Sequence, residues 1–509
     1  MLSKIFSAAT VGLSSIPVEV EVDVSATGLP SFTIVGLPDK AVEESKERVR
    51  SAIKNSGAEF PDRRITVNLA PADLPKEGPA YDVSIALGIL VASGQVGADL
   101  KKSLVFGELS LDGSLRHTNG TLPLVLLAQE KNFVEVFLPA VNAEEAAIVG
   151  GVNIYPVKNI RQLVEHLMNI HQIELQEHLE FNSLKSEVDF IFDMADIAGQ
   201  EHAKRALEIA AAGGHNLFMH GVPGAGKTML ARAFASILPE LSKEEALEVT
   251  KIYSISGNLP QGESIIKYRP FRSPHHTTSR IGLIGGGSRP KPGEISLAHR
   301  GVLFLDEFPE FPRHVLESLR QPMEDGIVQI SRAVGTMHYP ARFTLIAAAN
   351  PCPCGYYGSQ KKQCTCLPGS ISRYRKKLSG PILDRIDLHV EVPEVKLKKL
   401  TAEKLDGERS DVIRKRVQAA CARQRTRFRD GKILSNAEMN SREVRELCLL
   451  DATSKSLLTS ATAQMGLTAR SYFKIIKIAR TIADLSGEKE IAANHLAEAL
   501  QYRPKDVDL

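Results

Sequence analysis

The sequence predicts an α/β protein of several domains, and three observations lead to that prediction. An apolar run at residues 217–219 enters a glycine-rich stretch at 221–228 that opens into a helical pattern, as in a phosphate-binding αβα module. Residues 1–170 mix strand and helix patterns without such a stretch, which predicts a separate α/β domain. Beyond Ala402 the pattern is helical throughout, which predicts an all-helical C-terminal domain.

The first 170 residues carry the hydrophobic periods of both strands and helices. Residues 18–24 alternate strictly between apolar and polar side chains, which is the period of a strand with one solvated face. Apolar spacing and helix-stopping glycines predict the other elements. These are strands at 32–35 and 64–69, helices at 41–55 and 82–92, and a hairpin at 104–115 turned at Asp112 and Gly113.

The remaining boundaries follow from changes in composition. Residues 172–188 are polar and lack a clear apolar face, so we expect a linker at 171–195 that could be helical. The αβα module is expected at 196–395 and the helical domain at 396–509. The helices of the last domain are expected at 411–428, 441–449, 452–464, 469–485 and 491–501.

The glycine-rich stretch reads G-x-x-x-x-G-K-[ST], the pattern that holds the phosphates of a nucleotide. Its glycines let backbone N–H groups point at phosphate oxygens, and the helix that follows adds partial positive charge. We expect Lys227 to reach the outer phosphates of ATP and Thr228 to bind Mg²⁺, although a chance glycine-rich turn is the alternative. The expected ATP-binding residues are Gly221, Val222, Pro223, Gly224, Ala225, Gly226, Lys227 and Thr228.

Two later strands end in polar side chains that suit the same chemistry. The apolar run 301–305 is followed by Asp306, which would hold Mg²⁺, and by Glu307, which would polarise the attacking water. The run 343–349 ends at Asn350, whose amide could hold that water near the γ-phosphate. A buried strand with a polar end is the alternative for each.

Two arginines are candidates for stabilising charge on the γ-phosphate. Arg385 could bind phosphate oxygens across a subunit boundary, or it could pair locally with Asp384 or Asp387. Arg470 lies in the first turn of a helix, where a cation is unfavourable unless an anion is also present. It is therefore either a phosphate contact or an exposed arginine.

These elements, in this order, resemble those of an AAA+ ATPase, in which Asn350 corresponds to sensor 1, Arg385 to the arginine finger and Arg470 to sensor 2. By the same resemblance, Ile197 in the turn 196–201 is expected to pack on the adenine of ATP. The segment 273–279 and the glycines at 285–287 resemble the insert of the magnesium-chelatase branch, and 326–339 reads as a β-hairpin before sensor 1.

The N-terminal domain resembles Lon-type protease domains, in a fold of the S5 domain 2 type. Residues 75–80, P-K-E-G-P-A, and 106–113, F-G-E-L-S-L-D-G, carry that resemblance. Those proteases use a serine nucleophile and a lysine base, but the corresponding positions here are Ala80 and Leu122. The resemblance therefore implies the fold without peptidase activity, and a role in assembly or partner contact.

Taken over nearly all 509 residues, the chain resembles the ComM/YifB family of Mg-chelatase-like AAA+ ATPases. The resemblance implies a hexameric, ATP-hydrolysing DNA motor that drives branch migration in the recombination of transforming DNA. Recombination proteins are further expected partners. The alternatives are a magnesium-chelatase-like subunit for metal insertion, an ATP-dependent protease, and an ATP switch that scaffolds other proteins without translocation.

Four of the six cysteines lie within fifteen residues, as C-x-C followed by C-x-C. They are Cys352, Cys354, Cys364 and Cys366. Four thiolates could hold a tetrahedral structural Zn²⁺, although each spacing is one residue shorter than in the usual C-x-x-C knuckle. Reduced thiols in a loop rich in proline and glycine are the alternative.

Charge is unevenly distributed although the net charge is only +3. Residues 361–432 hold about 20 Lys and Arg against about 9 Asp and Glu, which favours either an anionic partner or a solvated basic surface. Seven of these, Arg414, Lys415, Arg416, Arg423, Arg425, Arg427 and Arg429, crowd one expected helix and its end. The expected DNA contacts are His275, His276, Arg280, Arg332, Lys361 and Lys362.

Other classes of protein are disfavoured by the bulk composition. No apolar run approaches 18 residues, so we expect no membrane span. Residues 1–6 do not lead into a long apolar segment, so we expect no signal peptide. Six cysteines in 509 residues do not suggest a disulfide framework. We therefore expect a cytoplasmic location.

Overall fold

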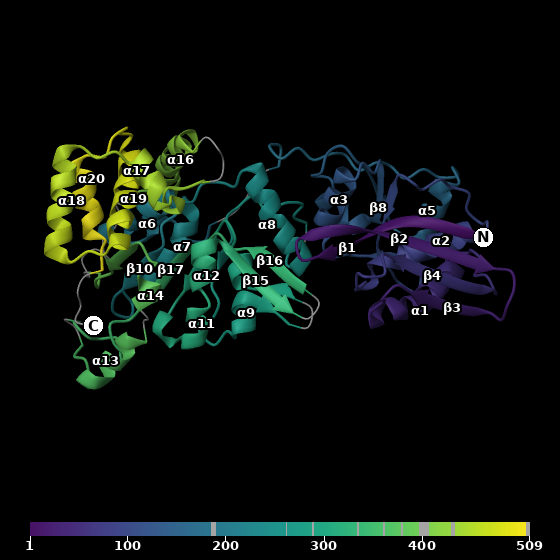
Figure 1. The fold of residues 1–509 in the computed structure, drawn as a ribbon, viewed down its shortest axis with the longest axis horizontal. Coiled ribbons are helices and arrows are strands. Elements are labelled where there is room, and N and C mark those ends of the chain that lie inside the picture. Colours follow the sequence, from purple (N-terminus) through teal and green to yellow (C-terminus); the bar gives the residue numbers. More distant parts are fainter. Residues whose placement is uncertain are drawn as a thin grey trace. The chain divides into compact units, whose positions relative to one another are not determined.

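A computed structural model describes residues 1–184, 190–260, 262–287, 290–332, 335–359, 362–377, 380–395, 407–428 and 433–504. These residues form two compact units (Figure 1). The first contains Met1–Ser186 and Lys243–Ile266, and the second contains Glu187–Ser242 and Lys267–Leu509. Within the described residues, no helix has both the length and the apolar composition needed to cross a bilayer.

The first unit is built on a seven-stranded mixed sheet in the order β3-β4-β2-β1-β5-β8-β9. Its strands are β1 (Leu2–Val11), β2 (Ser14–Ser25), β3 (Ser31–Val35), β4 (Arg64–Ala70), β5 (Ser103–Val105), β8 (Glu135–Pro139) and β9 (Asn153–Val157). β2 pairs antiparallel with β1 and β4, whereas β5, β8 and β9 run parallel. In β2 the apolar residues at every second position are buried, so the predicted strand 18–24 is confirmed.

The helices of this unit also follow the sequence patterns. They are α1 (Lys40–Asn55), α2 (Asp82–Ala92), α3 (Thr121–Glu130), α4 (Ala143–Ala146) and α5 (Ile160–Leu167). α2 is apolar on all sides and buried along nearly its whole length. The expected hairpin is confirmed by the pairing of β6 (Glu108–Leu109) with β7 (Leu115–Arg116), with Gly113 in the turn at a φ of 86°.

Ala80 and Leu122, the residues expected at the dyad positions, serve packing and hydrogen bonding. Ala80 lies in a short turn at Pro79–Tyr81, and Leu122 is fully buried at the start of α3. The backbone N–H of Leu122 donates to Glu145 Oε1 at 2.9 Å. Nearby Lys76 is buried and donates to the Pro71 carbonyl.

One helix of the first unit comes from the middle of the sequence. α8 (Lys243–Ser256) lies inside the range expected for the αβα module, yet it packs on α3. The Ser254 hydroxyl donates to Glu145 Oε1 at 2.5 Å, and Gly120 N–H donates to the Ser254 carbonyl at 3.1 Å. The chain therefore leaves the second unit after residue 242 and returns at residue 267.

The expected linker is irregular at 172–180, forms a turn at 181–184, and ends in a short 3₁₀ turn at Met194–Asp196. Gln176 N–H donates to the Ile154 carbonyl at 2.9 Å, and Leu179 N–H donates to the Ala147 carbonyl at 3.0 Å. Residues 172–184 form no helix, so the helical interpretation is wrong for them. Hydrogen bonds to the backbone of other residues in the first unit fix this polar segment, and they replace the hydrogen bonds that a helix would make within itself.

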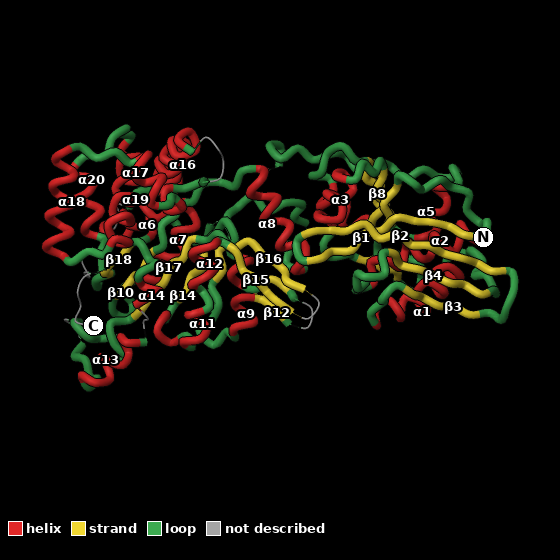
Figure 2. Tube along the Cα trace, viewed as in Figure 1, coloured by secondary structure: helices red, strands yellow, loops and turns green. Residues whose placement is uncertain are grey.

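The second unit is built on a five-stranded parallel sheet in the order β11-β14-β17-β10-β18. The strands are β10 (Leu217–His220), β11 (Phe271–Arg272), β14 (Val302–Leu305), β17 (Thr344–Ala349) and β18 (Leu388–Glu391). Figure 2 shows these strands among the helices of the unit. Burial of β10, β14 and β17 explains why these three strands read as continuous apolar runs rather than alternating ones.

Helices and two hairpins surround this sheet. The helices are α6 (Glu201–Gly213), α7 (Lys227–Ile237), α9 (Arg280–Ile284), α10 (Glu294–Leu297), α11 (Arg313–Glu317), α12 (Arg320–Asp325), α13 (Pro368–Lys376) and α14 (Gly380–Leu383). The hairpins are β12 (Gly285–Gly286) with β13 (Lys291–Pro292), and β15 (Ile327–Arg332) with β16 (Gly335–Pro340). The second hairpin confirms the one predicted before Asn350.

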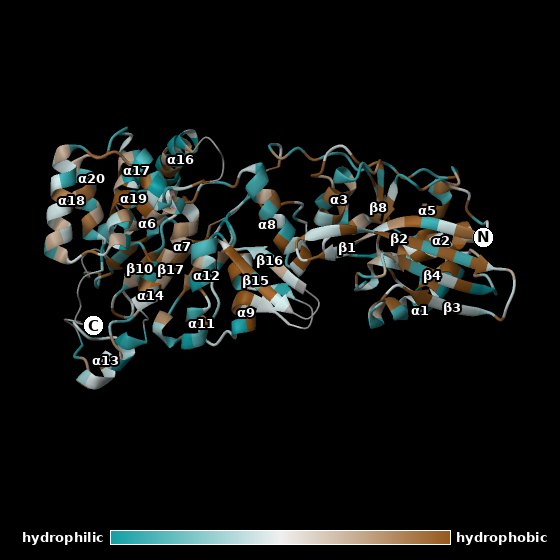
Figure 3. Ribbon diagram, in the orientation of Figure 1, coloured by the Kyte–Doolittle hydropathy of each residue, from teal (hydrophilic) through white to brown (hydrophobic). Residues whose placement is uncertain are grey.

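The C-terminal helices share one hydrophobic core with the sheet and with α6 and α7. They are α16 (Ser410–Arg427), α17 (Ser441–Leu447), α18 (Ala452–Met465), α19 (Ala469–Ser486) and α20 (Ala493–Gln501). Figure 3 shows α16 as mostly hydrophilic, whereas β10 and β17 are more apolar. α16 packs on α6, α7 and α19. Thr468 caps α19 by accepting from Ser471 N–H at 3.2 Å, as its position before the helix predicts.

Candidate active site

The phosphate loop lies between β10 and α7, at the carboxyl ends of the parallel strands. Gly224 and Gly226 have φ values of 79° and 94°, and a Cβ on either would meet no atom within 4 Å. A Cβ on Gly221 would lie 2.2 Å from the Val392 carbonyl oxygen, so only glycine fits there. The loop thus has the backbone conformation and the open space that phosphate oxygens require.

Lys227 joins the phosphate loop to the end of β17. Its Nζ donates to the carbonyls of Gly221 at 2.7 Å and Val222 at 3.0 Å, and to Asn350 Oδ1 at 3.1 Å. Burial lowers the pKa of this ammonium group, and the nearby Asp306 carboxylate opposes that effect. Lysine and asparagine, predicted as separate pieces of the site, are therefore in direct contact.

Thr228 and Asp306 form the oxygen pair that Mg²⁺ would need. The Thr228 hydroxyl donates to Asp306 Oδ2 at 2.8 Å, while Glu307 N–H donates to Asp306 Oδ1 at 2.8 Å. Hydroxyl and carboxylate oxygens are the donors that Mg²⁺ prefers. The arrangement suits a cation held between the phosphates of a nucleotide and the end of β14.

Glu307 is held by a histidine. The residue has a φ of 50°, and its Oε2 lies 3.2 Å from His276 Nδ1. The ring of His276 packs on that of His275, with centroids 4.0 Å apart. His276 was expected to contact DNA, but the structure places it against the carboxylate expected to polarise water. No local sequence pattern predicts this contact, since the two residues are 31 positions apart.

Arg385 and Arg470 converge on one carboxylate, Glu324 at the end of α12. Arg385 Nη2 lies 2.5 Å and Arg470 Nη2 3.0 Å from the same Oε1 atom. Hydrogen bonding from Arg385 first, and then from Arg470, lowers the pKa of Glu324. In the structure Arg385 therefore pairs with Glu324, which is far from it in the sequence, and not with the neighbouring Asp384 or Asp387 considered as alternatives.

The turn before α6 supports the phosphate loop through a residue that the sequence analysis missed. Gln200 Nε2 donates to the carbonyl of Ala225 at 3.1 Å and to that of Pro393 at 2.6 Å. Its φ of 60° is unusual for a residue other than glycine and turns the chain into α6. Ile197 is buried in the same turn, and its carbonyl accepts from Lys204 Nζ at 2.6 Å.

The four clustered cysteines come together directly after Asn350. Their sulfur atoms all lie within 4.8 Å of one another, although the pairs come from the two ends of the loop. All four are free thiols in the structure. The short C-x-C spacings therefore do not prevent a four-sulfur cluster.

The expected DNA contacts are only partly described. Arg280 is exposed at the start of α9, and Lys362 is exposed with its Nζ 4.3 Å from the centre of the Tyr356 ring. The His275 ring hydrogen-bonds the Thr277 hydroxyl at 2.9 Å. Lys361 and the side chain of Arg332 lie outside the described residues.

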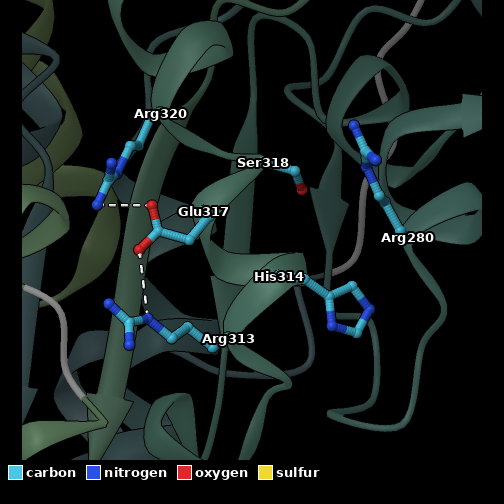
Figure 4. Close-up of a pocket in the computed structure, with 6 residues that line it drawn as sticks. All are labelled: Arg280, Arg313, His314, Glu317, Ser318 and Arg320. Atoms are coloured by element: carbon cyan, nitrogen blue, oxygen red, sulfur yellow. Dashed lines mark ion pairs between the residues drawn. The ribbon is translucent and has the colours of Figure 1, made fainter.

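Arg280 also lines an open pocket of about 830 Å³ (Figure 4). The other lining residues come from α11, from α12 and from the two-residue connection between them, and are Arg313, His314, Glu317, Ser318 and Arg320. Glu317 pairs with Arg320 at 2.6 Å and with Arg313 at 3.8 Å. Three arginines and one carboxylate line this pocket, which leaves a surplus of positive charge.

Several basic side chains of α16 form ion pairs or hydrogen bonds within the second unit. Arg416 pairs with Glu208 at 2.7 Å and with Glu408, and Arg427 pairs with the buried Asp484. The Arg414 guanidinium donates to the Ser236 carbonyl at 2.7 Å, and that of Arg423 donates to the Asp484 carbonyl at 2.7 Å. Arg414 and Arg416 therefore join α16 to α7 and α6, and Arg423 and Arg427 join it to α19. Arg429 lies outside the described residues.

Comparison with known proteins gives a consistent result along the whole chain. Three models of the magnesium chelatase subunit ChlI match, described as "Magnesium chelatase, subunit ChlI" at 193–400, "Subunit ChlI of Mg-chelatase" at 20–142 and "Magnesium chelatase, subunit ChlI C-terminal" at 407–503. The competence protein ComM of Haemophilus influenzae is 46% identical over 99% of this chain and 97% of its own length. YifB of Escherichia coli, named as uncharacterized, is 43% identical over the same shares.

The chain belongs to the ComM/YifB family of Mg-chelatase-like AAA+ ATPases. Membership of the ComM/YifB family implies ATP hydrolysis with Mg²⁺. The 38 kDa magnesium-chelatase subunit of Rhodobacter capsulatus is a more distant relative, 27% identical over 32% of this chain and 51% of its own length. The likeness to ComM and YifB therefore includes regions of the chain that the chelatase subunit does not match.

Proposed function

We propose that this protein is an ATP-driven DNA motor, assembled as a hexameric ring, that drives branch migration during recombination of transforming DNA. The relative from Haemophilus influenzae, similar over 97% of its length, is named a competence protein. A cytoplasmic site of action and contacts with recombination proteins belong to the same proposal. One observation carries it: Lys227, Thr228, Asp306 and Glu307 share one site, while Arg385 and Arg470 pair with Glu324.

The hydrolytic roles follow from the chemistry of this site. Lys227 would bind the outer phosphates, and Thr228 and Asp306 would hold Mg²⁺ between them. Glu307 would orient the attacking water and accept its proton, after His276 releases the carboxylate. Asn350 is positioned by Lys227 to contact the same water or the γ-phosphate.

A ring explains the two arginines that share Glu324. Each guanidinium can bind two phosphate oxygens in a plane, which is the geometry that transition-state charge on a γ-phosphate requires. Among the described residues, neither is paired with the phosphate loop of its own chain. We infer that both serve the ATP of a neighbouring subunit, and that Glu324 holds them until that phosphate is present.

The pocket in Figure 4 is the proposed DNA contact. Its surplus of arginine charge suits the sugar–phosphate backbone, which is the same for every sequence. Arg280 and His314 have no ion-pair partner among the described residues, so an incoming phosphate would meet them without breaking a pair. Motors that move along DNA need contacts of this sequence-independent kind.

The test is ATP-dependent conversion of a labelled four-way DNA junction by the full chain, with Lys227→Ala as the matched control. We expect conversion by the wild type in ATP and Mg²⁺, and none by the variant or after Mg²⁺ removal. ATP hydrolysis that is indifferent to DNA, without conversion, would contradict the motor. It would favour the chelatase-like subunit, which a tetrapyrrole-dependent ATPase assay would detect, or the scaffold.

A further inference from the structure

The four cysteines after Asn350 have the arrangement of a metal site. The loop that carries them connects β17 to α13. The Sγ of Cys352 lies 3.4 Å from that of Cys354 and 3.7 Å from that of Cys364, and the last two are 3.5 Å apart. Thiolates at about 2.3 Å from a tetrahedral metal lie about 3.8 Å from one another. The observed distances are close to that value and far longer than a disulfide bond.

Backbone N–H groups point at the sulfur atoms, as expected around anionic thiolates. Cys354 N–H donates to Cys366 Sγ at 3.3 Å, and Cys366 N–H donates to Cys364 Sγ at 3.4 Å. Tyr357 N–H donates to Cys352 Sγ at 3.3 Å. Such bonds offset negative charge on the sulfurs and fix the ligands in place.

We propose that Cys352, Cys354, Cys364 and Cys366 bind one structural Zn²⁺ ion. Four soft thiolates in a tetrahedron select zinc over Mg²⁺ or Ca²⁺, which prefer oxygen. Four protein ligands leave no open position on the metal, so its role is to hold the loop together.

The loop that the zinc would hold touches the ATP site at two points. Cys352 follows Asn350 by two residues, and Asn350 accepts a hydrogen bond from Lys227 at 3.1 Å. A Cβ on Gly355 would lie 2.4 Å from Pro223 Cγ, so the loop packs directly on the phosphate loop. We infer that the zinc fixes the position of Asn350 relative to the phosphate loop. This coupling rests on the proposed ATP hydrolysis, whereas zinc binding does not.

The first experiment measures metal content in the full chain, purified under reducing conditions without added metal. We expect one zinc per wild-type chain by mass spectrometry of the elements. Cys352→Ser and Cys364→Ser are expected to lose it, and Cys421→Ser, a cysteine outside the cluster, to keep it. Co²⁺ in place of zinc would give the intense visible absorption of a tetrahedral thiolate complex. Wild type without metal, with six reactive thiols or with disulfides, would overturn the proposal, as would iron in place of zinc.

The second experiment tests the coupling with a variant that leaves every ligand intact. Gly355→Ala places a Cβ against Pro223, and Gly358→Ala is its control, because Gly358 has a similar φ of 81° but open space around it. We expect both to keep their zinc, and Gly355→Ala alone to lose about tenfold or more in kcat, the scale at which residues around a metal site act. Equal ATPase rates in the two variants would overturn the coupling. Zinc binding itself is decided by the metal content measured in the first experiment.

Discussion

His276 lies 3.2 Å from Glu307 and limits the freedom of that carboxylate. A side chain that holds the proton acceptor away from water slows hydrolysis until it moves. A hydrogen bond between such partly exposed side chains is worth about 1 kcal/mol. We therefore expect His276→Ala to raise the ATPase rate without DNA by about two- to fivefold, measured as phosphate release at saturating ATP.

His275→Ala is the control for this change, because its ring packs at a tilt against that of His276 and hydrogen-bonds Thr277 rather than Glu307. Its basal rate should match that of the wild type. A fall in rate for His276→Ala, to the level of Glu307→Gln, would mean that the histidine orients the carboxylate for catalysis instead of restraining it.

At the scale of elements, Asp387 connects the start of β18 to α19. Its carboxylate accepts from Asn216 N–H at 3.0 Å and lies 3.7 Å from the His215 ring and 3.8 Å from Lys474 Nζ. Burial opposes its ionisation, but the His215 ring and the Lys474 charge lower its pKa to about 2. A carboxylate with a lowered pKa stabilises the folded state above its unfolded pKa of about 4.

Asp387→Asn should therefore lower the free energy of unfolding of the second unit by about 2 kcal/mol at neutral pH. The wild type should lose this stability as the pH falls from about 4 through 2, and the variant should lack that part of the acid sensitivity. Urea unfolding at several pH values measures both effects. The exposed Asp384→Asn is the control, and an equal loss in the two variants would show that Asp387 contributes no specific stabilisation.

The elements differ in how far the sequence predicts them. α2 occupies 82–92 as its apolar run and the following Gly94 predict, and Thr468 caps α19 as expected. The placement of α8 could not be predicted, because its contact with Glu145 joins residues 109 positions apart. For the same reason the contact between Glu324 and Arg470, which are 146 positions apart, could not be predicted from the sequence. The phosphate loop could be predicted, because its residues are contiguous at 221–228.

At the scale of the whole molecule, the ring proposal depends on which chain uses Arg385. The structure pairs this arginine with Glu324, together with Arg470. If both arginines act on the ATP of a neighbouring subunit, Arg385→Ala keeps a competent phosphate loop but leaves the ATP site of its neighbour without an arginine. We expect Arg385→Ala to bind ATP with nearly normal affinity and to lose most of its hydrolysis, as an arginine finger does.

Mixing two inactive variants distinguishes action between chains from action within one. Lys227→Ala lacks a working phosphate loop but keeps Arg385, and Arg385→Ala has the opposite defect. In a ring assembled from equal amounts of both, about one site in four would combine an intact loop with an intact neighbouring arginine. We expect the mixture to recover up to about a quarter of the wild-type ATPase rate, whereas each variant alone stays inactive. If Arg385 acted on its own chain, every site in the mixture would carry one defect, and no activity would return at any ratio.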